Sequence, residues 1–328
     1  VSSTVLITHQ PYNQHHLNTH PSHHLPHHQH AHNHYRHHHH HHKNHHHQHN
    51  HYYEHYHEDE NDYYDHSSVV VVTALFDIGR GDWYKYTRSY EQYLVYMIKL
   101  LKLKNRMVIF TDAEGAKLVR QRRHLKNTEI HEMTIQDIPL YRYRDEMKQI
   151  IEHEQNNWSF DQAMKDHPES KSVDYDIVVN SKAYFVYNAT QTSKFRYSVN
   201  YFTWIDAGYG HEDQSVVPPY CNWRPALPNG FITVIKMTPE YDKVGRYSIN
   251  DLYRVDWSVV SGGFFGGDVE AINRFYRFYH KTFMDLLDER KVDDDQTVLT
   301  LVMKHYPNLF YTLHSNGDWF ALFKFFPC

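Results

Sequence analysis

The segment 201–210 combines a strand-like run with a carboxylate, a pattern that suits a ligand site. The apolar and aromatic residues 201–205 predict a short buried strand, which ends at Asp206 and is followed by Ala207 and Gly208. A carboxylate supplies a hard oxygen ligand, and small residues let the backbone come close to a bound molecule. The alternative is that Asp206 only caps the strand and begins a turn.

Two later segments contain residue types that could complete such a site. The segment 259–268 places four glycines around two phenylalanines, and glycine is entropically costly inside an ordinary strand. It therefore fits either a backbone that approaches a ligand closely or a tight corner. The segment 293–299 opens a predicted helix with three aspartates and a glutamine. The helix dipole favours acids there, but three exceed what capping needs, so we expect one to point into a cleft.

Two single residues, Lys182 and His314, each have a functional and a structural interpretation. Lys182 is a candidate phosphate partner, and the alternative is a surface lysine in contact with solvent. His314 has a turn behind it that contains Gly317. A lone histidine of this kind is either a metal ligand or, as is more common, a structural residue.

The elements around these residues predict an α/β domain. The segment 68–76 is continuous, apolar and β-branched, so we expect a strand that is buried on both faces. The pattern then predicts a helix at 87–104, a strand at 106–111, a helix at 113–124 and a strand at 129–135. Alternation of this kind indicates a parallel sheet with crossover connections. Further elements are expected as helices at 145–165, at 183–189 and from 268, and as a strand at 230–236.

Composition and charge limit the function. The 328 residues carry a formal net charge of -5, with a pI of about 6.7, which does not favour a nucleic-acid surface. Residues 1–66 hold most of the 33 histidines, have no apolar periodicity and are predicted to be disordered. This His-rich tail either captures Zn²⁺, Cu²⁺ or Ni²⁺ through many weak imidazole ligands or is a tolerated repeat expansion. Residues 67–328 are predicted to form one folded domain.

The sequence bears on the cellular compartment only indirectly. Cys221 and Cys328 could form one disulfide, and Asn157 and Asn188 begin glycosylation acceptor sequences. No apolar run reaches the length of a membrane span. We therefore expect the protein to lie in the lumen of the secretory pathway (Golgi or ER) or to be secreted, with the cytoplasm as the alternative.

The order of the motifs resembles that of the HtrL/YibB family and, more broadly, that of GT-A type nucleotide-sugar glycosyltransferases. The resemblance covers residues 68–326 and is carried by the segments 73–77, 110–112, 181–182, 204–208, 261–267 and 294–299. No single motif is specific, but the six occur in the GT-A order. The resemblance implies a GT-A-like single α/β domain with a mostly parallel central sheet flanked by helices, preceded by the disordered tail.

The resemblance also implies a reaction and roles for individual residues. A sugar would move from a nucleotide-sugar donor to a hydroxyl of a glycan or other acceptor. By this resemblance, the nucleoside pocket would be lined by Thr73, Ala74 and Asp77. Backbone access to the donor sugar would be given by Gly262, Gly263 and Gly266. A base or a binder of sugar hydroxyls would be Asp294 or Asp295, beside Gln296.

The middle motif departs from the superfamily pattern, which is usually Asp-x-Asp and holds Mn²⁺ or Mg²⁺ against the two phosphates. Here Ala207 and Gly208 follow Asp206, so the second acid is missing. Asp206 therefore either holds Mn²⁺ or Mg²⁺ with help from His314, or binds the ribose without a metal. The missing acid leaves open a second function, a secreted His-rich metal-binding protein with a catalytically inactive sugar-binding module. A dehydrogenase is disfavoured because the Gly-rich dinucleotide fingerprint is absent.

Overall fold

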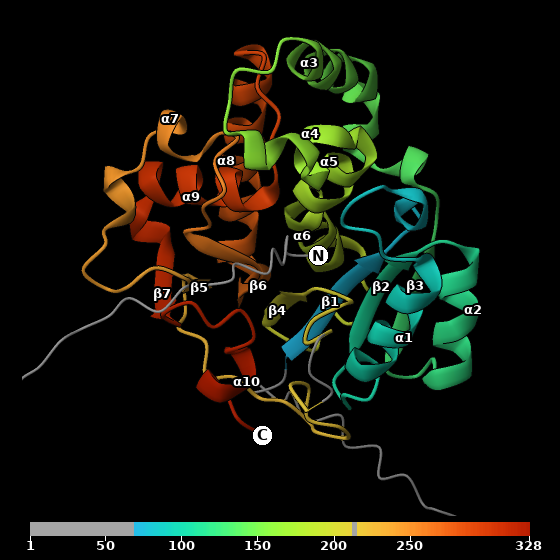
Figure 1. Cartoon of the computed structure of the whole chain (residues 1–328). Helices are drawn as coiled ribbons and strands as arrows, with labels where there is room; N and C mark the ends of the chain where they lie inside the picture. The colour runs from blue at the N-terminus through green and yellow to red at the C-terminus, as the bar shows by residue number, and fades with distance from the viewer. Residues whose placement is uncertain (1–68, 212–214) are drawn as a thin grey trace, which may run out of the picture. The chain divides into compact units, whose positions relative to one another are not determined.

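A mixed sheet of seven strands lies at the centre of the computed structural model, which describes residues 69–211 and 215–328 (Figure 1). The strand order is β3-β2-β1-β4-β6-β5-β7. The strands are β1 (Val69–Leu75), β2 (Met107–Thr111), β3 (Thr128–Glu132), β4 (Tyr201–Ile205), β5 (Ile232–Lys236), β6 (Val260–Asp268) and β7 (Phe310–His314). Only β6 runs antiparallel to its neighbours in this sheet, β4 and β5. The expected α/β architecture is confirmed, whereas the predictions for residues 1–66 lie outside the described residues.

Helices cover both faces of the sheet (Figure 1). They are α1 (Tyr90–Leu100), α2 (Ala113–Arg122), α3 (Arg144–Asn156), α4 (Pro168–Lys171), α5 (Val173–Asn180), α6 (Lys182–Thr192), α7 (Ile249–Leu252), α8 (Val269–Asp288), α9 (Asp295–His305) and α10 (Leu322–Phe325). Val70 and Val72 of β1 pack with α5, α6, α8 and α9, whereas Val69 and Val71 pack with α1, α2 and α10. Two covered faces explain why this strand is a continuous apolar run. None of the helices in the described ranges is both long and apolar enough to cross a membrane.

The glycine-rich segment is an internal strand, β6, and not the tight corner that was one of the two alternatives from the sequence. Close packing explains the missing side chains at its far end. A Cβ atom on Gly266 would lie 2.5 Å from Cγ2 of Thr203, and one on Gly267 would lie 2.6 Å from the carbonyl oxygen of Phe231. Glycine is entropically costly in a strand, but neighbouring residues leave no room for a side chain at these two positions.

The predicted helix at 145–165 was too long. α3 ends at Asn156, and the side-chain amide of Asn157 donates to the carbonyl oxygen of His153 over 2.9 Å. A separate 3-10 helix, Gln162–Asp166, then begins behind Asp161, whose carboxylate accepts a hydrogen bond from the backbone N–H of Ala163. Asparagine and aspartate compete with the helical backbone in this way, which divides the predicted helix into two pieces.

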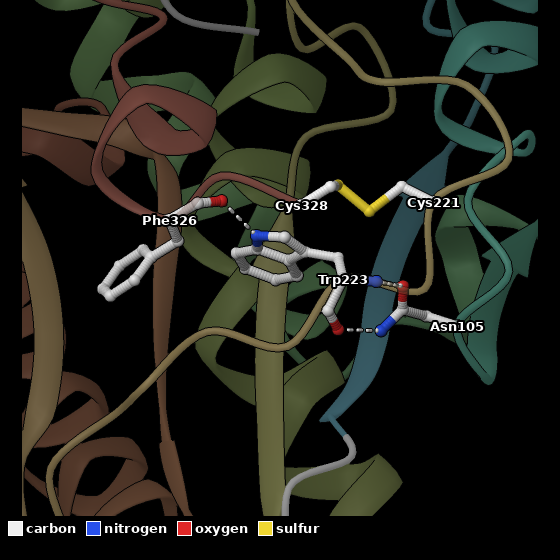
Figure 2. Close-up of a disulfide and its surroundings, with 5 residues drawn as sticks. All are labelled: Asn105, Cys221, Trp223, Phe326 and Cys328. Carbon is white, nitrogen blue, oxygen red and sulfur yellow. Dashed lines mark hydrogen bonds between the residues drawn. A yellow bond between two sulfur atoms is a disulfide. The ribbon is translucent and has the colours of Figure 1, made fainter. Parts of the chain in front are cut away.

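A disulfide anchors the long connection between β4 and β5. Cys221 and Cys328 are bonded, with Cα atoms 6.1 Å apart and a separation of 107 positions in the sequence. Figure 2 shows the bond and its surroundings. Beside the bond, the backbone N–H of Trp223 donates to the side chain of Asn105 over 2.9 Å, and its ring N–H donates to the carbonyl oxygen of Phe326 over 2.9 Å (Figure 2). The connection is thus fixed both to the start of β2 and to the C-terminal segment.

Candidate functional site

Asp206 lies at the carboxyl end of β4, where the sequence predicted it. Its side chain is buried, with 5% of the residue exposed. Its backbone N–H donates to the carbonyl oxygen of Gly263 over 3.1 Å, and its Oδ1 accepts a hydrogen bond from the ring N–H of Trp204 over 2.6 Å. The backbone contact holds this residue against β6, and the hydrogen bond from Trp204 orients its carboxylate, which is more than a turn cap requires.

Lys182, at the first position of α6, connects Asp206 to a second carboxylate. Its Nζ lies 3.0 Å from Oδ1 of Asp206 and 2.8 Å from Oδ2 of Asp295, and it donates to the carbonyl oxygen of Gly262 over 3.0 Å. Lys182 is 4% exposed, so it is not the surface lysine of the alternative interpretation. We call Asp206, Lys182 and Asp295 the lysine-carboxylate cluster.

The members of the lysine-carboxylate cluster set one another's pKa. Burial alone would raise the pKa of Asp206, but the Lys182 ammonium and the hydrogen bonds from Lys182 and Trp204 act together against burial, and the pKa of this carboxyl lies well below its usual range. For Asp295, burial outweighs the ammonium, so the pKa of Asp295 is raised. Burial alone would lower the pKa of Lys182, but the two carboxylates raise it. Asp206 and Lys182 are thus the charged pair, and Asp295 is the member whose ionisation is least favourable.

Gly262 makes this arrangement possible. A Cβ atom at this position would lie 2.3 Å from Oδ2 of Asp295, the oxygen that Lys182 contacts. Next to it, a Cβ atom on Gly263 would lie 3.3 Å from the ring of Tyr209. The first two glycines of β6 therefore make room for groups at the cluster, whereas Gly266, packed against Thr203, lies away from it.

The three consecutive acids have three different partners. Asp294 is the N-cap of α9, and its Oδ1 accepts hydrogen bonds from the backbone N–H groups of Gln296 and Thr297. Its Oδ2 accepts the side-chain amide of Gln296 over 2.9 Å. Asp293 lies 3.5 Å from Nη1 of the buried Arg254. Of the three acids, only Asp295 contacts Lys182. None of the three lines the cavity described below, so the expectation that one of them points into a cleft is not met there.

A cavity lies beside the cluster, between the carboxyl ends of β1 and β4. It encloses about 620 Å³, including its open mouth, and its lining includes Ala74, Asp77, Lys182 and Asp206. Aromatic rings form much of its wall, those of Phe76, Tyr90, Tyr93, Tyr175 and Trp204. The loop that follows β1 is fixed by the N-cap residue of α2, because Oδ2 of Asp112 accepts the backbone N–H of Asp77 over 3.1 Å.

Eight of the predicted site residues do not line this cavity: Thr73, Gly262, Gly263, Gly266, Asp294, Asp295, Gln296 and His314. Thr73 is fully buried within β1, where it is paired with Ile109, and it does not line the cavity. His314 ends β7 at the same edge of the sheet as Asp206, but β6 and β5 lie between their strands. Three strand spacings amount to roughly 14 Å, so the structure does not bring these two side chains together as a metal pair.

Two arginines in the cavity wall were missed by the sequence argument. Arg80 is 4% exposed, and its guanidinium donates to the phenolic oxygen of Tyr93 over 2.8 Å. Arg88 also lines the cavity, and its Nη1 is buried without a hydrogen-bond partner among the described residues. Arg80 stands between two glycines in the loop after the first strand, which was a usable signal, because such loops often bind ligands.

Comparison with known proteins places the chain in a family. A family model described as "Bacterial protein of unknown function (HtrL_YibB)" matches residues 67–328. Protein HtrL of Escherichia coli (strain K12) is 28% identical over 269 residues, which cover 79% of this chain and 93% of that protein. The resemblance read from the motifs is therefore confirmed at the level of the family, and the chain belongs to the HtrL/YibB family.

Proposed function

We propose that the chain is a GT-A type glycosyltransferase that moves a sugar from a nucleotide-sugar to an acceptor hydroxyl. The observation that carries the proposal is the position of the cavity. From β1 the chain proceeds outward through β2 and β3 and then returns to β4 on the other side of β1. The crevice between β1 and β4 is therefore a topological switch point, which is where open α/β sheets bind nucleotides at the carboxyl ends of their strands.

The lining of the cavity suits the two halves of a nucleoside diphosphate. Phe76, Tyr93 and Trp204 offer flat apolar surfaces for a base, and Asp77 offers a carboxylate for ribose hydroxyls. Arg80 and Arg88 offer guanidinium groups for phosphate oxygens. The cavity volume of about 620 Å³ lies within the usual range for ligand sites.

In this proposal the acceptor oxygen forms a new bond to the anomeric carbon of the donor sugar. The bond from that carbon to the diphosphate oxygen breaks, and its electron pair remains on the diphosphate. We assign the proton of the acceptor hydroxyl to Asp295 rather than Asp294, because both oxygens of Asp294 are occupied by capping contacts. The raised pKa of Asp295 brings its basicity closer to that which general-base catalysis needs.

A panel of nucleotide-sugars tests the function. We expect one donor to raise the thermal stability of the full chain and to release its nucleoside diphosphate when acceptors are supplied. At a ligand concentration about 100 times the Kd, the stabilisation should be about 2.7 kcal/mol. Asp206→Asn should lose the thermal shift, and Asp285→Asn, on the exposed face of α8, should keep it.

The outcomes separate the two functions considered. Binding with release of the nucleoside diphosphate supports the transferase. Binding without release under all acceptors would instead support the inactive sugar-binding module, which the absence of an acid at Gly208 favours. No shift with any donor would refute both.

We also propose that the protein works in an oxidising compartment such as the secretory lumen. The disulfide between Cys221 and Cys328 supports this proposal, because such bonds persist mainly in oxidising compartments. Mapping the bond by mass spectrometry of the protein taken from its native cells would test it, and two free thiols would contradict it.

A further inference from the structure

We propose that this site binds a nucleoside diphosphate without a divalent cation, with the Lys182 ammonium in the cation's place and Arg80 and Arg88 offsetting the phosphate charge. This inference rests on the proposed function and makes it more specific. It concerns how the charge of the ligand is balanced, and it departs from the Mn²⁺ or Mg²⁺ that the family resemblance implies.

The donor atoms around Asp206 do not fit a divalent cation. At a nucleotide site Mg²⁺ is usually held by one or two carboxylates together with phosphate oxygens and water. Here Oδ1 of Asp206 already faces the Lys182 ammonium and the ring N–H of Trp204. Ala207 and Gly208 offer no side-chain donor, and His314 lies three strands away. Across residues 69–211 and 215–328, no three His, Cys, Asp or Glu side chains are grouped so that they could hold a metal.

A protein cation already lies between the two carboxylates. An ammonium has three N–H donors, and Nζ of Lys182 has three acceptors at 3.0, 2.8 and 3.0 Å, on Asp206, Asp295 and Gly262. The side chains of the three cluster members are 5–9% exposed. A metal ion would have to displace this buried ammonium, which would leave the lysine charge without its partners at considerable cost.

Positive charge for the phosphates is available elsewhere in the same cavity. The guanidinium of Arg80 donates to Tyr93 and to the backbone oxygen of Tyr86, both of which are uncharged acceptors. Neither Arg80 nor Arg88 forms an ion pair with a carboxylate in the described parts of the chain. A buried cation without a counter-ion is unfavourable, so an anion from outside would satisfy both groups. A guanidinium fork also matches the geometry of phosphate oxygens.

These contacts give the two sets of cations different roles. Lys182 neutralises the buried acids, and the arginines face the ligand. When the diphosphate leaves, its growing charge would meet fixed guanidinium groups that need no reorganisation. A bound metal would then contribute little to diphosphate binding, because Lys182 occupies its position and the two arginines supply its positive charge.

Calorimetric titration of the full chain with UDP, GDP, ADP, CDP and dTDP tests the inference. Each titration is run in excess EDTA and again in excess Mg²⁺, which is chosen because it binds imidazoles weakly and so avoids the His-rich tail. We expect at least one diphosphate to bind in EDTA, with a Kd that Mg²⁺ changes by less than about threefold. Binding that requires Mg²⁺ would overturn the inference and leave the proposed function standing. No binding in either buffer would refute both.

Variants test which groups carry the charge. Arg88→Gln should weaken binding in EDTA by roughly 10-fold or more, the loss expected for a charge-assisted hydrogen bond. Arg277→Gln, on the exposed face of α8, is the matched control and should bind as the unchanged protein does. Circular dichroism would verify that both variants fold. Unchanged binding by a folded Arg88→Gln variant would overturn the assignment of the arginines to the phosphates.

Discussion

Replacing Lys182 with methionine tests the lysine-carboxylate cluster directly. The change keeps a long flexible side chain but removes the ammonium that lies 3.0 Å from Asp206 and 2.8 Å from Asp295. Removing one partner of a buried ion pair costs about 3–5 kcal/mol, because it leaves an uncompensated charge. The side chains here are 5–9% exposed, so the full figure applies. We expect the free energy of unfolding to fall by about 4 kcal/mol near neutral pH.

The pH dependence gives a second, independent signature. In the unchanged protein Lys182 holds the pKa of Asp206 below its unfolded value, so the stability it contributes is present above about pH 4 and is lost as the pH falls further. Without the ammonium, burial raises the folded pKa of Asp206, and stability falls as the pH rises. The difference between the two proteins should therefore be smallest at the lowest pH measured, below about pH 4, and grow as the pH rises towards neutral.

Urea unfolding followed by circular dichroism at several pH values measures this difference. Lys117→Met is the matched control, since Lys117 is 64% exposed in a 3.6 Å pair with Glu114, and it should change stability by less than about 0.5 kcal/mol. Adding Asp295→Asn to Lys182→Met should recover part of the loss, because one unpaired carboxylate disappears. A loss below about 1 kcal/mol near neutral pH, or one that is the same at every pH, would refute the reasoning.

Three further predictions concern other parts of the domain. Gly262→Ala should lower the free energy of unfolding by about 1–3 kcal/mol and weaken diphosphate binding, because the added Cβ would lie 2.3 Å from Asp295. Gly245→Ala is the control, since no atom lies within 4 Å of its Cβ. It should be neutral in the same urea and calorimetric assays. Burial is the main reason that the pKa of Asp293 is raised to about 6. The stability of the unchanged protein relative to Asp293→Asn should therefore fall by on the order of 2 kcal/mol as the pH rises from about 4 to 7. Equal pH profiles for the two proteins would contradict this prediction. Cys221→Ser should cost roughly 2–5 kcal/mol, and a reductant should destabilise the unchanged protein but not this variant.

Most strands could be predicted from the sequence because each is a compact apolar run between polar residues. The predicted strands at 68–76, 106–111 and 201–205 match β1, β2 and β4 within one or two residues. β6 could not be predicted from its composition, because the reason for its glycines is the bulk of residues on other elements, such as Thr203. Local propensity gives no information about such neighbours.

The candidate site was predictable one residue at a time but not as a set. Asp206 and Asp295 each stand at the end or start of a regular element, where sequence patterns are most informative. Lys182 joins them from 113 positions before Asp295, and no local pattern links those three segments. Arg80 and Arg88 were missed for a similar reason, because their missing counter-ions become evident only when the surrounding chain is in place.

The bridge between Cys221 and Cys328 also bears on the order in which the domain matures. Cys328 follows β7, so a ribosome has made all seven strands of the described sheet before the second sulfur exists. During that time the ring N–H of Trp223 also lacks the carbonyl oxygen of Phe326. Disulfide formation takes seconds to hours, much longer than helix or hairpin formation. The β4–β5 connection is therefore expected to be the last part of the domain to become fixed in a newly made chain, once an oxidant has joined the two sulfur atoms.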